Sequence, residues 1–195
     1  MKSFLGFLLE SKHKFSKTVA LVGGSYKPPH CGHLDMVMKY ADMADEVKVI
    51  ISDPKSEKSI RKTSNGTVIT PEMSKKIWDI YIKRYGLKNV TAEVSTEPSP
   101  ITALYKYVDD NLSDVNVIFG VSKKGNDAAR FKTALKYYAD NEHIDLIDPE
   151  TTAVDPYVSS GQPVSATDIR NNINDALILK KMLPGKLSDS DIKQI

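Results

Sequence analysis

Short apolar strands that alternate with helices are the feature that most constrains the fold of this chain. Five runs rich in β-branched residues have the length of buried strands, at residues 18–22, 46–52, 89–95, 115–119 and 143–147. Apolar residues at helical spacing occupy residues 32–44, 70–86, 99–112 and 126–139, and a helical section runs from Ser165 until Pro184 and Gly185. This alternation predicts right-handed crossovers and helices on both faces of a parallel sheet. We therefore expect an α/β, doubly wound, parallel five-stranded sheet with C-terminal helices.

Ligands of such sheets bind beyond the carboxyl ends of the strands, near the reversal in strand order. The loops that follow residues 22, 52, 95, 119 and 147 are therefore the places where a site is expected. The loop at residues 53–70 is long, polar and basic, with almost no apolar residues. We expect this loop to be mobile without ligand and to close over the site as a lid.

The composition excludes several classes of protein. A length of 195 residues suffices for one domain with a sizeable core, and the net charge of +2 gives no general affinity for nucleic acid or anionic lipid. No run approaches the roughly 20 apolar residues that span a bilayer. The single cysteine, Cys31, excludes an internal disulfide and a cysteine-rich zinc site, and it fits a reducing compartment. We expect a cytoplasmic protein with no nucleic-acid or membrane partner, whose residues 18–195 form a single domain.

Residues 1–17 precede the first strand and are expected to form an N-terminal arm or a targeting-like peptide. The apolar run from Phe4 to Leu9 is too short for a secretory signal, and no small-residue cleavage site follows it. A short helix or a frayed arm is one interpretation. The other is a resemblance to the targeting peptides of internal head proteins in large tailed phages, which are removed after Leu-x-Glu, here Leu8-Leu9-Glu10. The protein would then be phage-encoded and lie in the host cytoplasm or the virion.

The loop after the first strand has the features of a phosphate site. It reads Gly23-Gly24-Ser25-Tyr26-Lys27-Pro28-Pro29-His30-Cys31-Gly32-His33, which is neither a Walker loop nor a G-x-G-x-x-G fingerprint. Glycines let the backbone approach a ligand, and the next helix begins with free N–H groups at the positive end of its dipole. Two imidazoles at this helix start can donate hydrogen bonds to phosphate oxygens. The alternatives are that His30 caps the helix while His33 packs against the sheet, or that the pair binds zinc.

A second motif near the C-terminus has the same character. Ser165 and Asp168 form a capping-box pattern at the start of a helix. The hydroxyls of Ser165 and Thr167 add donors, and Arg170 offers a planar fork that matches phosphate oxygens. A well-capped helix with a solvated arginine is the alternative.

Together these motifs resemble those of the nucleotidyltransferase superfamily, which shares a His-x-Gly-His motif and a late Ser-Ser-Thr-x-x-Arg-like motif. The resemblance covers nearly the whole chain from Thr18 onward. It implies a Rossmann-like sheet and an enzyme that transfers a nucleotidyl group from a nucleoside triphosphate to a phosphate acceptor, with release of pyrophosphate and no covalent intermediate. It also implies small-molecule nucleotide substrates and Mg²⁺, which would bridge the phosphates with few or no protein ligands. The superfamily often forms homo-oligomers.

The resemblance further implies roles for individual residues. The catalytic group would be His33 at the reacting α-phosphate, His30 at the outer phosphates and Arg170 at the β- and γ-phosphates, and we expect a charged imidazolium at His33. The nucleotide would be bound by Gly23, Gly24, Ser25, Lys27, Gly120, Ser122, Lys123, Ser165 and Thr167. The candidates for the acceptor side are Lys55, Lys58, Ser99 and Thr102.

The details of the motifs favour ATP as donor and a mononucleotide as acceptor. Pro28 and Pro29 before the first histidine, and the ending Ser-Ala-Thr-x-Ile-Arg, resemble the adenylyl branch. Arg170 favours a mononucleotide acceptor, with nicotinamide mononucleotide first. Two residues depart from the pattern of the family. Lys27 stands where Asp, Asn or Gln is common, and Ala166 replaces a second serine. The alternatives are a cytidylyltransferase that uses CTP and a non-catalytic phage-head protein that retains the fold.

Overall fold

The five predicted strands form one parallel sheet in the order β3-β2-β1-β4-β5, so the strand order reverses between β1 and β4. The computed structural model describes residues 14–123, 128–159 and 162–194. The strands are β1 (Thr18–Gly24), β2 (Glu46–Ile51), β3 (Val90–Val94), β4 (Val115–Phe119) and β5 (Ile144–Ile147). Each lies within two residues of its predicted run, because β-branched residues buried on both faces favour parallel strands.

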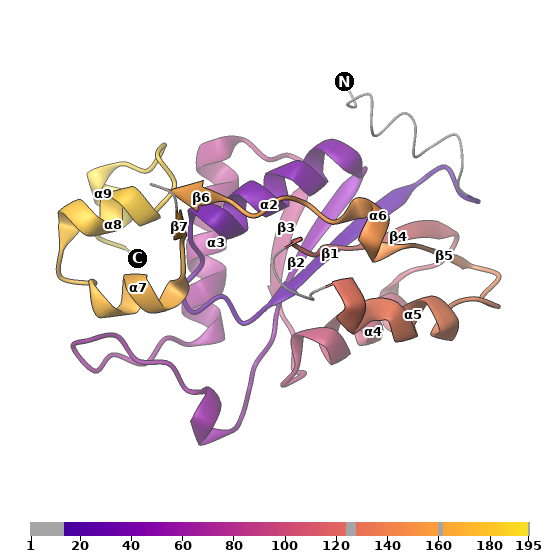
Figure 1. Ribbon diagram of the computed structural model, residues 1–195, viewed down its shortest axis with the longest axis horizontal. Helices are drawn as coiled ribbons and strands as arrows, with labels where there is room; N and C mark the ends of the chain where they lie inside the picture. The colour runs from indigo at the N-terminus through magenta and orange to yellow at the C-terminus, as the bar shows by residue number, and fades with distance from the viewer. Residues whose placement is uncertain (1–13, 124–127, 160–161, 195) are drawn as a thin grey trace.

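Helices cover both faces of this sheet (Figure 1). One face carries α2 (Cys31–Met43) and α3 (Pro71–Tyr85), and the other carries α4 (Pro100–Asn111) and α5 (Lys132–Tyr137). Alternate residues of β1 show the division, since Ala20 and Val22 pack with α2 and α3 whereas Leu21 packs with α4. The doubly wound, Rossmann-like sheet is thus confirmed. No helix in the described ranges combines the length and apolarity needed to cross a membrane.

The C-terminal helices form a small cluster of their own beside α3 (Figure 1). They are α7 (Ala166–Asn171), α8 (Ala176–Met182) and α9 (Asp189–Ile192), and their buried residues are Ile169, Leu179 and Leu183. Arg84 of α3 binds Asp191 of α9 through two nitrogens, with N–O distances of 2.8 and 2.9 Å. Hydrogen bonds from Arg84 and from Ser188 lower the pKa of Asp191 to about 2. This ion pair attaches the C-terminal helices to the helical layer of the sheet.

The loop at residues 53–70 has more structure than the sequence indicated. It contains the 3₁₀ turn η1 (Glu57–Ser59) and an antiparallel bridge between Lys62 and Val68. Its tip is attached to α7, because the backbone N–H of Ser64 donates to the carbonyl of Arg170 at 2.9 Å. Ile69 is buried and anchors the end of the loop. One long-range hydrogen bond and one buried side chain thus contact a segment whose composition predicted a free loop, and its mobility stays a prediction.

The segment after β4 also differs from the prediction. The expected helix at 126–139 is the 3₁₀ turn η2 (Ala128–Phe131) followed by α5, and residues 124–127 lie outside the described ranges. The short helix α6 (Pro149–Thr152) and the hairpin of β6 (Val158–Ser159) and β7 (Gln162–Pro163) were not predicted. These elements have one turn or two residues each, too short to leave a periodic signal in the sequence.

Most of the predicted N-terminal arm, residues 1–13, lies outside the described ranges, and so does its proposed cleavage sequence. The end of the arm contacts β4. The N–H of Phe15 donates to Asn116 Oδ1 at 3.0 Å, and Asn116 Nδ2 donates to the carbonyl of Phe15 at 2.6 Å. The chain is therefore held to the sheet three residues before β1 begins.

Candidate active site

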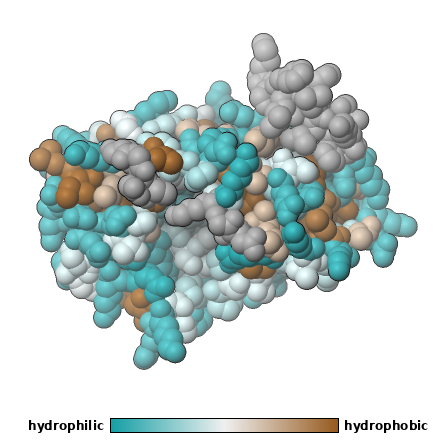
Figure 2. Space-filling model, viewed as in Figure 1, coloured by the Kyte–Doolittle hydropathy of each residue, from teal (hydrophilic) through white to brown (hydrophobic). Residues whose placement is uncertain are grey.

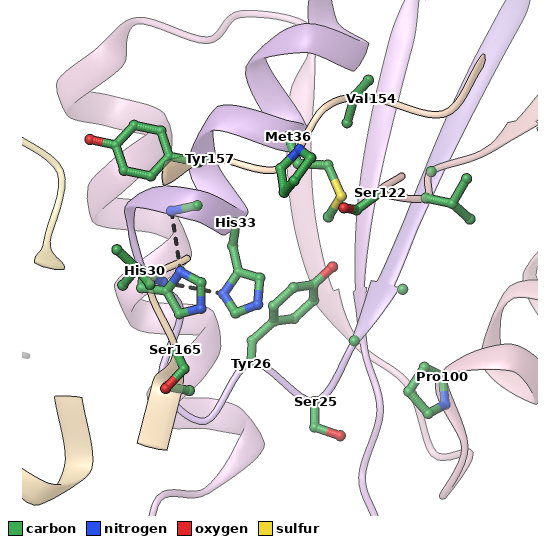
Figure 3. A pocket seen from close by; sticks show the side chains of 18 of the residues that line it. Ser25, Tyr26, His30, His33, Met36, Pro100, Ser122, Val154, Tyr157 and Ser165 are labelled. Atoms are coloured by element: carbon green, nitrogen blue, oxygen red, sulfur yellow. Dashed lines mark hydrogen bonds between the residues drawn. The ribbon is translucent and has the colours of Figure 1, made fainter. Parts of the chain in front are cut away.

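A cavity of about 420 Å³ opens at the carboxyl ends of β1 and β4, where the strand order reverses (Figure 3). This is the position at which sheets of this topology bind their ligands. The loop between β1 and α2 and the start of α4 contribute to the wall, as do residues after β4, after β5 and before α7. Among the predicted residues, those that line it are Gly23, Gly24, Ser25, His30, His33, Gly120, Ser122 and Ser165.

The loop between β1 and α2 has a strained backbone that its own contacts hold in place. Tyr26 has a φ of 46°, a left-handed conformation that is unfavourable for a residue with a Cβ. Its hydroxyl donates to the carbonyl of Val22 at 2.9 Å, and its own carbonyl accepts from Ser74 Oγ at 2.5 Å. The Tyr26 ring also excludes any side chain at position 24, because a Cβ on Gly24 would lie 2.7 Å from Cζ of that ring. Backbone strain of this kind is characteristic of binding sites.

The two histidines form the start of α2 together. The Nδ1 atom of His30 accepts from the N–H of Gly32 at 3.2 Å, and the Nδ1 atom of His33 accepts from the N–H of His30 at 3.3 Å. The rings are stacked with centroids 3.7 Å apart, and Tyr26 meets the His33 ring edge-on at 5.0 Å (Figure 3). Because each Nδ1 is an acceptor, the proton of each neutral ring lies on Nε2. His30 is thus a helix cap, as one alternative held, and both rings also line the cavity.

The charged imidazolium expected at His33 during the reaction is not the form that this ring has in the protein without ligand. Burial of the ring, and to a smaller extent the charge of His30 beside it, holds the pKa of His33 well below its usual range. At neutral pH, His33 is therefore a neutral hydrogen-bond donor. The sequence does not show this, because the stacking of the two rings depends on the capping geometry.

The C-terminal motif reaches the same cavity through its first residues. Ser165 caps α7, accepting from the N–H of Asp168 at 3.2 Å and donating to its carboxylate at 2.6 Å. Ser165 and Ala166 line the cavity together with His30 and His33. Thr167 is exposed, and its hydroxyl accepts from Arg170 Nη2 at 2.8 Å.

Arg170 lies behind the cavity wall and does not line this cavity. Its Nη1 donates to the carbonyl of Lys27 at 2.6 Å, which joins α7 to the loop between β1 and α2. Burial, with a contribution from Arg61, lowers the pKa of Arg170 from its high usual value. The Lys27 side chain is buried, and the pKa of its ammonium is lowered by that burial. In the structure, Arg170 therefore supports the histidine loop through the Lys27 carbonyl.

The other predicted residues lie further from the cavity. Lys123 follows the Gly120 turn and binds Asp155 at 3.1 Å. Lys55 and Lys58 are exposed on the 53–70 loop, and Lys55 binds Asp53. Ser99 and Thr102 do not line the cavity, although their neighbours Pro100 and Ile101 do. The acceptor-side candidates are thus not brought together with the histidines.

Several lining residues were not singled out from the sequence. They belong to the helical segment after β4 and to the loop after β5: Arg130, Phe131, Val154, Asp155, Pro156 and Tyr157. A signal existed for the last four, because they follow the strand that ends at residue 147, and loops after strands are where ligands bind. Met36 of α2 also lines the cavity, at a position that the sequence indicates only as helical.

Within the described residues, no three His, Cys, Asp or Glu side chains are grouped closely enough to hold a metal ion. The zinc alternative for the histidine pair fits this geometry poorly, since both Nδ1 atoms already accept backbone hydrogen bonds.

Comparisons with known proteins agree with this geometry. A family model described as Cytidylyltransferase-like matches residues 21–172, which include both motifs. No curated protein matches the chain.

Solved structures share the fold at low sequence identity. A bifunctional NMN adenylyltransferase/ADP ribose pyrophosphatase of Francisella tularensis, complexed with AMP and a Mn ion, has 16% identity and a TM-score of 0.55 over 89% of this chain and 45% of that protein. The chain thus spans less than half of that bifunctional protein. The nicotinic acid mononucleotide adenylyltransferase of Plasmodium falciparum, complexed with NaAD, has 16% identity and a TM-score of 0.55 over 92% of this chain and 94% of that one. A Vibrio parahaemolyticus protein thought to be a nicotinate-nucleotide adenylyltransferase has 20% identity and a TM-score of 0.52, with coverage of 90% and 91%.

Proposed function

This chain belongs to the cytidylyltransferase-like family of nucleotidyltransferases, and on that basis we propose that it transfers the adenylyl group of ATP to a phosphate-bearing acceptor, with nicotinamide mononucleotide as the first choice. In this reaction a phosphate oxygen of the acceptor attacks the α-phosphorus of ATP. The bond from that phosphorus to the bridging oxygen breaks, and pyrophosphate leaves.

One observation carries the proposal. The histidine pair at the start of α2 and Ser165 at the start of α7 line a single cavity at the strand-order reversal, although well over a hundred residues separate them in the chain. The start of α2 directs the positive end of a helix dipole toward this cavity. This dipole, two imidazole donors and the Ser165 hydroxyl suit a polyphosphate better than an uncharged ligand.

The residues would act mainly by alignment and charge stabilisation. The Nε2–H of His33 would donate to a non-bridging oxygen of the α-phosphate, where charge changes most during attack. His30 would donate to the outer phosphates, and Arg170 would turn from the Lys27 carbonyl toward the β- and γ-phosphates. Ser25, which shares a hydrogen bond of 3.1 Å with Ser52, would approach the nucleotide from the end of β1. Gly120 and Ser122 would face the base and ribose, and Lys123 would lie near them.

Packing inside the protein restricts position 120, where the chain leaves β4 beside the cavity. A Cβ on Gly120 would lie 2.8 Å from Val22 and 3.0 Å from Tyr40, so this position is closed to any larger residue.

Mg²⁺, bound to the phosphates and not to a cluster of side chains, would supply charge neutralisation of the triphosphate.

Pyrophosphate release tests the proposal directly. Purified protein with ATP and Mg²⁺ is given nicotinamide, nicotinate or flavin mononucleotide, or phosphopantetheine, and both pyrophosphate and the dinucleotide product are measured. Product with nicotinamide mononucleotide is expected. Product with another acceptor would keep the adenylyl transfer and correct the acceptor.

Two outcomes would select the alternatives. Turnover of CTP with an alcohol phosphate, and none of ATP with any acceptor in the panel, would make the protein a cytidylyltransferase. The other outcome is that the protein binds ATP but forms no product, and that His33→Ala binds ATP as well as the wild type does. This outcome would favour the non-catalytic role in a phage head.

A further inference from the structure

A second cavity, also of about 420 Å³, lies among α3, the C-terminal helices and the tip of the 53–70 loop. Its walls are largely apolar, and the buried residues among them are Ile69, Ile77, Ile169, Leu179 and Leu183. The cavity is open to solvent, since Asn65, Thr67, Asn174, Ala176 and Lys193 of its lining are exposed. Pockets for small organic ligands have about 300–1,000 Å³. A space of this size and polarity therefore has the properties of a ligand site.

The charges of this cavity select one class of ligand. Two of the lining residues are charged, Arg170 and Lys193, and both are cationic. No Asp or Glu is among the described residues that line it. Thr63, Thr67 and Asn174 add polar groups, so the lining has an apolar body with a positive and hydrogen-bonding margin. This pattern complements an organic anion with an aliphatic body, and it disfavours a cation of the same shape.

The second cavity is linked to the candidate active site through the histidine loop, although no residue lines both cavities. Pro28, from the histidine loop, lines it, and Arg170 joins that loop to α7 through the Lys27 carbonyl at 2.6 Å. The backbone carbonyl of Arg170 also accepts from the N–H of Ser64 at the tip of the 53–70 loop. A ligand in this cavity would therefore contact the residues that hold the histidine loop.

From this volume, lining and charge, we infer that the cavity is a second ligand site that binds a small organic anion with an aliphatic chain. This binding does not depend on the nucleotidyl transfer. A change in the KM for ATP on binding is a further consequence, and it rests on the proposed function.

Calorimetric titration of the full chain with decanoate tests the site, with decanol and decylamine as the neutral and cationic analogues. We expect saturable binding of one decanoate per chain, weaker binding of decanol, and none of decylamine. Ala176→Trp places a large side chain in the lining and should weaken decanoate at least tenfold. Leu177→Trp is its matched control, because Leu177 is the next residue of α8, is 76% exposed and does not line the cavity.

A second pair of variants tests the charge. Lys193→Gln should weaken decanoate about three- to fivefold, the loss expected for one exposed ion pair, without changing the binding of decanol. Lys181→Gln, on α8 outside the lining, should change neither. If Ala176→Trp fails to fold, the affinities of Lys193→Gln and Lys181→Gln for decanoate still test the proposed site.

The inference is overturned if decanoate does not bind saturably, if decylamine binds as well as decanoate, or if both members of a variant pair behave alike. ATP turnover is measured separately in the same samples. Decanoate binding without turnover would refute the proposed function and leave the site, and turnover without binding would do the reverse.

Discussion

Replacement of His33 tests whether this residue acts in the reaction as a neutral or as a charged hydrogen-bond donor. His33→Ala removes the Nε2–H donor from the cavity, and it also removes the acceptor for the N–H of His30 at 3.3 Å. Loss of one donor to a charged transition state costs about 10²- to 10³-fold in kcat, and loss of a cap costs about 1 kcal/mol of stability. We therefore expect a folded variant with a kcat lowered by about 10²-fold or more and a smaller change in the KM for ATP.

His33→Gln is the informative partner of this variant. Its amide keeps a neutral N–H donor at similar reach, and burial already keeps the wild-type ring neutral by lowering the pKa of His33. The structure thus predicts that glutamine restores activity to within about tenfold of wild type, since most of the donor's contribution is retained. His143→Ala is the control for histidine loss. His143 is exposed and binds Asp114 at 2.8 Å. Both residues lie at the amino ends of β4 and β5, whereas the cavity lies at the carboxyl ends of the strands.

The assay is initial-rate pyrophosphate release with saturating acceptor, measured from pH 6 to 8. A neutral donor whose pKa lies well below the usual histidine range stays neutral over this interval, so His33 should contribute no rise in kcat as the pH falls. The reasoning is refuted if wild-type kcat rises toward pH 6 while His33→Gln stays as inactive as His33→Ala. That result would mean that the phosphates raise the pKa of His33 and that its positive charge is required.

Three further predictions concern other parts of the structure. Arg170→Ala should raise the KM for ATP by about tenfold or more, because the variant lacks the charged phosphate contact proposed for the ATP complex. Arg170→Lys should recover only part of this loss. Steady-state kinetics would contradict this by showing an unchanged KM. Gly24→Ala should destabilise the protein by about 1–3 kcal/mol, because its Cβ would lie 2.7 Å from the Tyr26 ring. Gly185→Ala is the control and should change stability by less than about 0.5 kcal/mol, because the space around Gly185 is open. Equal urea midpoints of the two variants would count against the packing argument. Trypsin should cleave the 53–70 loop more slowly with ATP present if the loop closes over the phosphates; identical cleavage with and without ATP would remove the lid.

The sheet could be predicted from the sequence because its signal is local. The run from residue 115 to 119 has three β-branched residues and ends at Gly120, and it is β4 without any change of boundary. Thr70, Pro71 and Gly86 predict the ends of α3 by the same kind of local rule, and the Thr70 hydroxyl indeed accepts from the N–H of Met73 at 3.2 Å.

The rest depends on contacts between distant parts of the chain. The tip of the 53–70 loop is placed by the bond between Ser64 and Arg170, which no local pattern encodes. The low pKa of His33 comes from burial of its ring and, to a smaller extent, from the charge of His30 beside it, although the histidines themselves are visible in the sequence. Tyr157 lines the cavity because β5 lies beside β4, and the order of strands in a sheet is not written in any one of them.

The hydrogen bond from Arg170 to the Lys27 carbonyl has a consequence for the order in which the protein becomes functional during its synthesis. The ribosome synthesises a chain from its N-terminus at about 5–20 residues per second, and domains generally fold as units. The histidine loop acquires the partner for its Lys27 carbonyl only after residue 170 has emerged. A nascent or C-terminally truncated chain would thus carry both histidines without the brace that holds their loop. If the loop must be braced for the proposed function, binding of ATP would wait until the segment that carries Arg170 has folded against it.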